Sequence, residues 1–303
     1  MVTASTSLTV TARRLVDLAA RNAAPLRLGL SVGGVILAVG LFIVAGSPGF
    51  DLYAYWNVDP ADPYGSPQGF GAFHYSPAMA VAFLPLKLLP WPLAYWVWLG
   101  LMLLVLAWLG RRWTLALLLF PPVVLELYEG NIHLLIAAAL VRGLRRPAAW
   151  AFLLLTKITP GAAVLWSAVR RDWPALAVTM AVTAAIVVAS FIATPDAWRS
   201  WVAHLSVAEA VPTPNQLPIP LLVRLPVAGL VIAWGALTDR PWTLAVGTTL
   251  ALPVVWFHGL AVLAAIPALL DRRRTSALVA GPASGPATEA SAAGRPLPGR
   301  WRR

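Results

Sequence analysis

Cysteine is absent from the 303-residue chain, and lysine occurs only at two positions. The lack of cysteine excludes disulfides and every metal or redox site that depends on a thiol. Charged residues make up only 12% of the chain, whereas a soluble domain has about 25%. The sequence also contains no P-loop, no glycine-rich nucleotide loop, no zinc-spaced histidine cluster and no serine nucleophile elbow. These absences argue against a soluble domain and against a nucleotide site.

Hydrophobic residues are abundant instead. They account for 59% of the chain, and the mean hydropathy is +0.74. Several apolar runs approach or exceed the roughly 18–20 residues that cross a bilayer. They lack the alternation with period two that is typical of membrane β-strands. We therefore predict an all-α, polytopic membrane protein.

The net charge of +11 comes almost entirely from arginine. The arginines lie in short clusters between apolar runs, which is the positive-inside pattern rather than a nucleic-acid-binding patch. Residues 1–27 are therefore predicted to be a cytoplasmic segment, followed by a transmembrane domain over 28–270. Residues 271–303 are rich in Ala, Gly, Pro and Arg and are predicted to form a disordered cytoplasmic tail. The pattern indicates a multi-pass membrane protein with both termini in the cytoplasm.

About 8–10 transmembrane or half-membrane helices are expected in this domain. Residues 147–169 lie between two basic clusters that are both predicted to be cytoplasmic, and a single membrane crossing cannot have both ends on one side. The break TKITPG therefore predicts a re-entrant pair of half-helices with Lys157 at the tip. Residues 242–270 are expected to turn at 256–259. The first loop, 47–92, is predicted outside, with an interfacial helix over 76–90. The remaining helices are expected at about 28–46, 93–110, 113–127, 132–142, 174–194 and 217–237, with an outer loop at 195–216.

This topology gathers polar side chains from separate segments on the outer side. They include Asp51, Glu129, Asn131, Asn215, Gln216 and His258. Ionisable groups near the hydrocarbon are costly and usually line a cavity or pathway, so we expect an outward-facing site there.

Simpler interpretations stay open for most of these residues. The acids, including Glu126, can be solvated groups at the headgroups, and the Asn–Gln pair can belong to an ordinary turn. The four tyrosines of the first loop, Tyr53, Tyr55, Tyr64 and Tyr75, can form an aromatic belt. His258 can be an interfacial histidine, and Arg224 can snorkel to headgroups.

Several motifs follow one another in a recognisable order. They are GFDLYAYWNVDPADPY with FHYSPAMAVAFLPLKLLP, EGNIHLL at 129–135, LLTKITPG at 154–161, and PNQLPIPLLVRL with LPVVWFHGLAVLAAIPALL. Together they resemble glycosyltransferase family 87, the bacterial polyprenol-phosphate-mannose-dependent mannosyltransferases of the GT-C superfamily. The chain departs from the family at HYSP, which replaces a Tyr-Pro-Pro, at IHLL, which lacks a second Asn or Gln, and at NQLP, which lacks a Ser.

The resemblance implies a GT-C fold with an extracytoplasmic site beneath the first loop. The donor would be a polyprenyl-phosphate sugar, with mannose as the expected sugar, and the acceptor a lipid or glycan. Transfer would invert the anomeric centre and need no metal or cofactor. A lipid-linked-sugar transporter and a catalytically silent homologue are the alternatives.

The resemblance also assigns roles to residues. Asp51 matches the first-loop acid and is expected to be the general base, with His258 as second choice or phosphate contact. Lys157, with Arg224 or Arg199, is expected to bind the donor phosphate. The remaining candidates for substrate binding are Tyr53, Tyr55, His74, Tyr75, Glu129, Asn131, Asn215 and Gln216.

Overall fold

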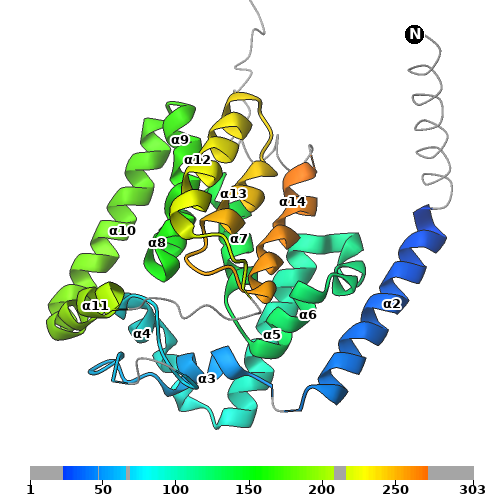
Figure 1. Ribbon diagram of the computed structural model, residues 1–303, viewed down its shortest axis with the longest axis horizontal. Helices are drawn as coiled ribbons and strands as arrows, with labels where there is room; N and C mark the ends of the chain where they lie inside the picture. Colours follow the sequence, from blue (N-terminus) through cyan, green and yellow to red (C-terminus); the bar gives the residue numbers. More distant parts are fainter. Residues whose placement is uncertain (1–22, 47, 66–68, 208–215, 272–303) are drawn as a thin grey trace, which may run out of the picture.

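The computed structural model describes residues 23–46, 48–65, 69–207 and 216–271 (Figure 1). Within these ranges every regular element is an α- or 3-10 helix, and the only β-type pairing is an isolated bridge between Gln216 and Trp256. The prediction of an all-α protein is therefore confirmed. The segments predicted at the two termini lie largely outside the described residues, and so does Asn215.

Among the described residues, three helices are long and apolar enough to cross a membrane. They are α2 (Ala23–Val44), α5 (Trp91–Gly110) with the adjoining turn η2 (Arg111–Trp113), and α10 (Trp173–Ala193). A fourth span is possible if α6 (Pro121–Glu129) and α7 (His133–Gly143), which are bent by 111° at their junction, count as one.

The other elements are shorter. Four apolar stretches are formed by α4 (Pro77–Phe83) with η1 (Leu84–Leu88), η5 (Thr159–Val164) with α9 (Leu165–Val169), α12 (Leu221–Leu237), and η6 (Phe257–Ala265) with α14 (Ile266–Leu270). The remaining short helices are α3 (Phe50–Asn57), η3 (Ala116–Leu119), η4 (Pro147–Trp150), α8 (Ala151–Lys157), α11 (Pro195–Val207) and α13 (Thr243–Ala251). Full-length and half-length helices are thus mixed, as the sequence predicts.

Both segments that are predicted to be broken contain a break. In the segment 147–169, α8 ends at Lys157, and Ile158 follows with a left-handed φ of 46° before η5 begins, as predicted. In the segment 242–270, the break lies earlier than the predicted turn at 256–259: α13 ends at Ala251 and η6 begins at Phe257, so that His258 lies in the first turn of η6.

Three predicted segments differ from the structure. The helix expected at 113–127 is divided into η2, η3 and α6. A proline inside a helix removes a hydrogen bond but is tolerated at the first helical position, so α6 starts at Pro121. The predicted loops at 47–75 and 195–216 contain α3 and α11. The second of these helices also begins at a proline, Pro195, with Asp196 in its first turn, which is a favourable place for a negative charge.

The core surrounds α7. This helix packs against η6, η4 and α5, and most of its residues are buried, from His133 to Gly143. In contrast, only 6% of the 18-residue apolar segment of α2 is buried, and only 11% of that of α10. Large exposed apolar surfaces of this kind are unusual for a soluble protein and fit contact with lipid.

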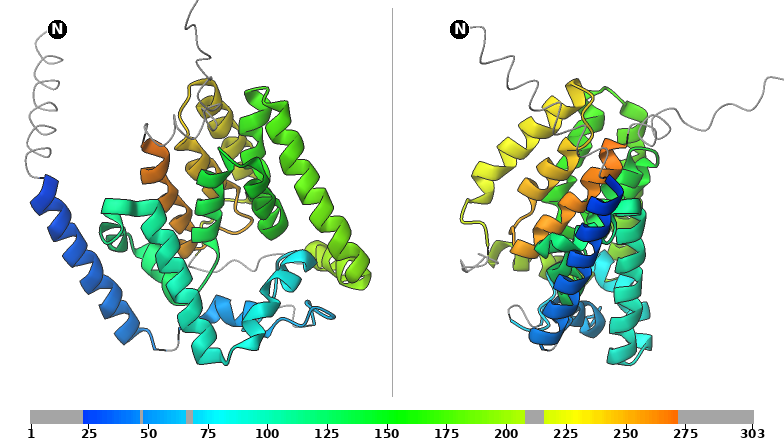
Figure 2. Two further views of the ribbon diagram at one scale, coloured as in Figure 1. Left: turned by 180° about the vertical axis from the view of Figure 1, so that it is seen from behind. Right: turned by 90° about the vertical axis from the view of Figure 1, so that its right-hand side faces the viewer.

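The ends of the helices gather into two groups. Arg111 pairs with Asp271 at 3.4 Å and Arg170 with Asp239 at 3.0 Å, which joins ends that the sequence predicts to be cytoplasmic. Helices α3, α4 and α11 lie together at the lower end of Figure 1, whereas α2 begins and α14 ends towards the top (Figures 1 and 2). These helix ends, which are predicted to lie on the same side of the membrane, are therefore in contact. Which group faces the cytoplasm stays a prediction.

Candidate active site

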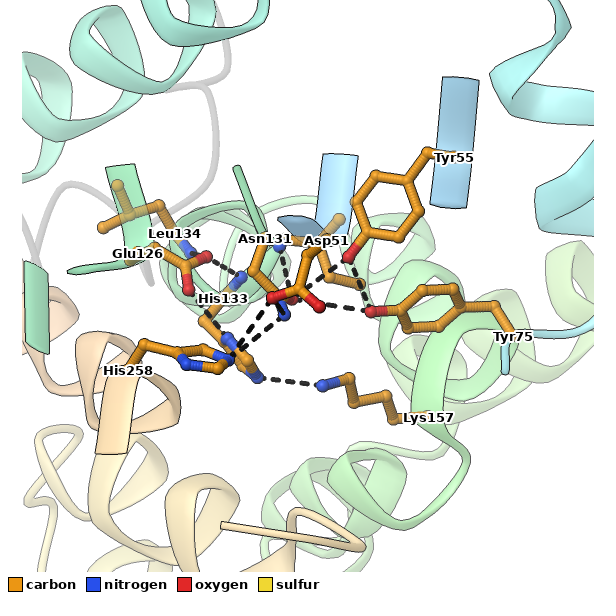
Figure 3. Close-up of polar contacts among 10 residues, drawn as sticks. Asp51, Tyr55, Tyr75, Glu126, Asn131, His133, Leu134, Lys157 and His258 are labelled. Carbon is orange, nitrogen blue, oxygen red and sulfur yellow. Dashed lines mark hydrogen bonds and ion pairs between the residues drawn. The ribbon is translucent and has the colours of Figure 1, made fainter. Parts of the chain in front are cut away.

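The junction between α6 and α7 organises the polar cluster. Gly130 ends α6 with a φ of +71°, and a Cβ placed there would lie 2.7 Å from the Leu52 Cβ of α3. A second tie is the hydrogen bond that the Gly49 N–H donates to the Tyr128 carbonyl at 2.8 Å. Glycine tolerates both the left-handed conformation and the close approach. The junction thereby brings the start of α3 against the start of α7 (Figure 3).

Asp51 and Asn131 face each other across this contact. The Asn131 Nδ2 donates to the Asp51 Oδ2 at 2.6 Å, and the Nε2 of His258 lies 3.6 Å from the same oxygen. The other carboxylate oxygen makes no hydrogen bond to a described residue, and 26% of the Asp51 side chain is exposed. Burial raises the pKa of Asp51 from 3.8 to about 6; the Asn131 hydrogen bond and the charge of Lys157 oppose this rise, and the charge of Glu126 adds to it. A carboxylate with this pKa is suited to general base catalysis near neutral pH.

Asn131 is held in one orientation by its own surroundings. Its Oδ1 accepts hydrogen bonds from the Ile132 N–H at 2.7 Å and from the Tyr55 hydroxyl at 3.2 Å. The Ile132 N–H can only donate, so the amide oxygen must lie on that side and the amide nitrogen points the other way, towards Asp51. The same nitrogen lies 3.3 Å from the His258 Nε2. Asn131 therefore joins the first loop, α7 and η6 in one network.

Two of the predicted tyrosines complete this network. The hydroxyls of Tyr55 and Tyr75 lie 2.8 Å apart, and the Tyr75 hydroxyl also reaches the Asn131 Oδ1 at 3.5 Å. Both side chains are almost fully buried. Their hydroxyls thus contact the Asn131 side chain at its oxygen, while its nitrogen contacts Asp51.

A second chain of contacts leads from α6 to Lys157. Glu126 is fully buried, and its Oε2 lies 2.8 Å from the Nδ1 of His133. Its Oε1 accepts hydrogen bonds from the backbone N–H groups of His133 and of Leu134, the latter at 3.3 Å. The His133 Nε2 in turn lies 2.9 Å from the Lys157 Nζ, and Lys157 also lies over the Tyr75 ring, 5.7 Å from its centroid.

A metal ion does not fit this arrangement well. Glu126, His133 and His258 each offer one ligand atom, and these atoms lie within 4.8 Å of one another. However, both ring nitrogens of His133 are already used, one by Glu126 and the other by Lys157. An ion would have to displace one of these partners, and the nearby ammonium would repel it.

The comparison with protein families decides the identity of the chain. The sequence model of Glycosyltransferase family 87 matches residues 73–284, which is well over half of the chain. The chain belongs to glycosyltransferase family 87. The matched region contains Asn131, His133, Lys157 and His258, whereas Asp51 lies before it. The same comparisons find no match among the curated proteins or the solved structures.

The family membership confirms the resemblance on which the residue roles were predicted. The protein is thus a membrane glycosyltransferase, and the cluster around Asp51 and Asn131 is its candidate active site. The structure brings together Asp51, Tyr55, Tyr75, Asn131, Lys157 and His258 (Figure 3).

Two further candidates lie close to the cluster of this glycosyltransferase. Glu129, the last residue of α6, is half-buried and near enough to Asp51 and Glu126 for their charges to interact. Gln216 forms the bridge to Trp256, and the neighbouring Leu217 N–H donates to the Val255 carbonyl at 2.9 Å. Gln216 is therefore placed beside the chain that leads into His258.

Other candidates lie in separate contacts. Tyr53 stacks on Phe70 with ring centroids 4.4 Å apart. The His74 Nδ1 lies 3.0 Å from the Nε2 of His204, which ties the first loop to α11. Their assignment to substrate binding stays a prediction, with no contact to the Asp51–Asn131 pair to support it.

The two arginines predicted to bind the donor phosphate are engaged elsewhere. Arg224 is only 4% exposed, and its guanidinium donates to the carbonyls of four residues, Ile219, Leu250, Leu252 and Pro253, at 2.6–2.9 Å. These contacts join α12 to the end of α13 and leave little capacity for a phosphate. Arg199 is largely exposed and pairs with Asp196 at 2.6 Å. Lys157 is the better placed of the three predicted cations.

Sequence reasoning missed one member of the cluster. His133 lies in the apolar run IHLLIAAAL, where an ionisable side chain is costly and is itself a sign of function. Glu126 was interpreted only as a residue flanking a helix in the headgroup region. The sequence predicts a break between the helices expected at 113–127 and 132–142, but not the angle of 111° between α6 and α7 on which the pairing of Glu126 with His133 depends.

Proposed function

We propose that this glycosyltransferase moves a sugar from a polyprenyl-phosphate donor to an extracytoplasmic lipid or glycan acceptor, with mannose as the expected sugar. The observation that carries the proposal is the Asp51 carboxylate, one oxygen of which makes no hydrogen bond to the described residues, beside a cluster that also contains Lys157. An acid with a pKa near 6 and a cation within electrostatic reach are the two groups that such a transfer requires.

In this reaction the Asp51 carboxylate takes the proton of the acceptor hydroxyl. The acceptor oxygen attacks the anomeric carbon from the face opposite to the phosphate. The bond between that carbon and the phosphate oxygen breaks, and its electron pair leaves with the polyprenyl phosphate. Attack from the opposite face inverts the anomeric centre. Lys157 stabilises the charge that develops on the phosphate, as fixed cations do in phosphate-releasing reactions.

His258 supports the reaction from beside Asp51. Its Nε2 lies 3.6 Å from the carboxylate and 3.3 Å from the Asn131 amide. From this place it either shares a proton with Asp51 or contacts the donor phosphate. A His258→Gln variant separates the two roles, because loss of a phosphate contact raises the KM for the donor, whereas loss of a proton partner changes the pH profile.

The test of the proposal is the Asp51→Asn variant. With membranes that contain polyprenyl-phosphate-[14C]mannose, transfer to lipid or glycan should fall by a factor of about 10² to 10⁴, because the amide cannot accept the proton. Asp59→Asn is the matched control: Asp59 is an exposed acid of the same loop, and its carboxylate accepts a local hydrogen bond from the Ala61 N–H. It should keep the rate of the unmodified protein.

Three outcomes would contradict the proposal or part of it. Full activity of the Asp51→Asn variant would remove Asp51 as the base. Binding of the donor without hydrolysis or transfer would indicate a catalytically silent homologue. Movement of the donor across vesicles without bond cleavage would indicate a transporter.

A further inference from the structure

We propose that Glu126 and His133 form a positioning pair that holds the Lys157 ammonium in the active site by fixing the tautomer of His133. Neither residue needs to touch the substrate. The role of the pair in catalysis rests on the proposed function, in which Lys157 binds the donor phosphate.

The argument starts at the beginning of α7. The first N–H groups of a helix lack partners within the helix, and here the Glu126 Oε1 accepts two of them, from His133 and Leu134. This contact fixes the carboxylate, so that Oε2 faces the His133 Nδ1 at 2.8 Å. Glu126 therefore combines the cap of α7 with a contact to the imidazole.

The carboxylate determines where the imidazole carries its hydrogen. An ionised carboxylate only accepts hydrogen bonds, so the Nδ1 of His133 must be the donor, and in a neutral ring the Nε2 is then an acceptor. The Nε2 lies 2.9 Å from the Lys157 Nζ. An ammonium group has only donors, so this tautomer is the one that can bind Lys157.

Lys157 keeps free capacity in this position. Of the three hydrogens of its ammonium, one is used by His133, and no second hydrogen bond to a described residue is formed. The Tyr75 ring, 5.7 Å away, adds a weak attraction. A lysine side chain has a flexible four-carbon stem. Fixing its head therefore places two N–H donors where a phosphate could meet them, without the cost of ordering the side chain during the reaction.

A single isosteric change tests the tautomer. In Glu126→Gln the two backbone N–H groups retain the amide oxygen, so the amide NH₂ must face the His133 Nδ1. That nitrogen then has to accept, the ring hydrogen moves to Nε2, and an N–H points at the ammonium. The variant keeps the shape of the site and the cap of α7 but removes the acceptor for Lys157.

Kinetics in a double-mutant cycle provide the first measurement. Glu126→Gln should lower kcat/KM for the polyprenyl-phosphate-mannose donor by about tenfold or more, which corresponds to the loss of one charged hydrogen bond. Lys157→Met should lower it further. In the Lys157→Met background, Glu126→Gln should have almost no additional effect. Independent, multiplying effects would overturn the proposal, since they would mean that Glu126 does not act through Lys157.

Amine labelling provides a second measurement that does not require transfer. The chain has only two lysines, Lys87 and Lys157, and Lys87 serves as an internal reference because its Nζ donates to the Val58 carbonyl at 2.7 Å in a different part of the protein. The quantity to measure is the rate of reductive methylation of Lys157 divided by that of Lys87, both at the same pH. This ratio should be higher in Glu126→Gln than in the unmodified protein. An unchanged ratio would overturn the proposal.

The two measurements also separate this inference from the proposed function. If the labelling ratio changes but the protein transfers no sugar, the result supports the positioning pair and contradicts its role in catalysis. If Glu126→Gln does not fold, His133→Phe replaces it, because phenylalanine keeps a ring in the core but offers Lys157 no acceptor. The same lack of additivity with Lys157→Met is then expected, and multiplying effects would again overturn the proposal.

Discussion

Asp51 shows how one residue of this glycosyltransferase gains its chemistry from its surroundings. It is the second residue of a short helix, and the start of a helix favours the charged form of a solvated acid. Here burial between α3 and the α6–α7 junction raises its pKa to about 6, although Asn131 and Lys157 oppose the rise. The group is thus a stronger base than an exposed aspartate and is still ionised at neutral pH.

A prediction about pH follows from this value. A general base works only when it is deprotonated, so kcat/KM for transfer should be constant above about pH 7 and should fall as the pH drops through about 6. The direction of the fall follows from the need for a deprotonated base, and burial, which raises the pKa of Asp51 from 3.8 to about 6, determines the pH at which it occurs. The pH–rate profile with polyprenyl-phosphate-mannose measures it.

The control for the pH profile is the residual activity of Asp51→Asn, which should lack this acidic limb. An acidic limb near pH 4, as for a solvated aspartate, would show that the carboxylate is not desolvated in the working enzyme. An identical limb in Asp51→Asn would assign the titration to another group.

At this scale, part of the site could be predicted. Asp51, Asn131, Lys157 and His258 stand out in the sequence because each is a polar residue beside an apolar run, and the positive-inside pattern places three of them on one side. His133 meets the same criterion, but nothing in the sequence indicates that it pairs with Glu126 and Lys157. Its role depends on the tautomer that Glu126 imposes, which only coordinates can reveal.

At the scale of elements, the junction of α6 and α7 depends on Gly130. Its φ of +71° is disfavoured for other residues, and an added Cβ would meet the Leu52 Cβ at 2.7 Å. Gly130→Ala should therefore destabilise the protein by about 1–3 kcal/mol and should move α3, and with it Asp51, away from Asn131. Both the thermal unfolding temperature in detergent and the rate of transfer should fall.

Gly100→Ala is the matched control for this prediction. Gly100 lies inside α5, and a Cβ placed there meets nothing within 4 Å. Alanine also favours a helix more than glycine does, by about 1 kcal/mol, so this variant should unfold at the same or a slightly higher temperature. Equal behaviour of the two variants would show that the conformation and packing of Gly130 are unimportant.

The elements themselves were predictable where apolar length or proline placement determines them. The break near Pro160 was predicted correctly, because a proline gives a visible signal. The over-long apolar run 242–270 was predicted to turn at 256–259, but its break lies earlier, between Ala251 and Phe257. The helices α3 and α11 were missed because their sequences are mixed in polarity and were interpreted as loops. The break between α6 and α7 was predicted, since separate helices are expected at 113–127 and 132–142, but its angle of 111° and the close approach of Gly130 to Leu52 were not.

At the scale of the whole molecule, the helix ends form two separate groups. One group contains the pairs Arg111–Asp271 and Arg170–Asp239, and the other contains the cluster around Asp51. Arginine-rich ends are typically cytoplasmic, so the cluster should open to the opposite side of the membrane. A lipid-linked donor used there would be reached without any cytoplasmic nucleotide.

The absence of cysteine makes this orientation directly measurable. Asp59, in the first loop, and Arg145, which follows α7, are both exposed and belong to the two predicted sides. In the variants Asp59→Cys and Arg145→Cys each thiol is the only one in the protein. A membrane-impermeant maleimide should label Asp59→Cys in intact cells, and it should label Arg145→Cys only after the membrane has been permeabilised. The reverse result would place the active site in the cytoplasm and would contradict an extracytoplasmic acceptor, because the site and its acceptor must face the same compartment.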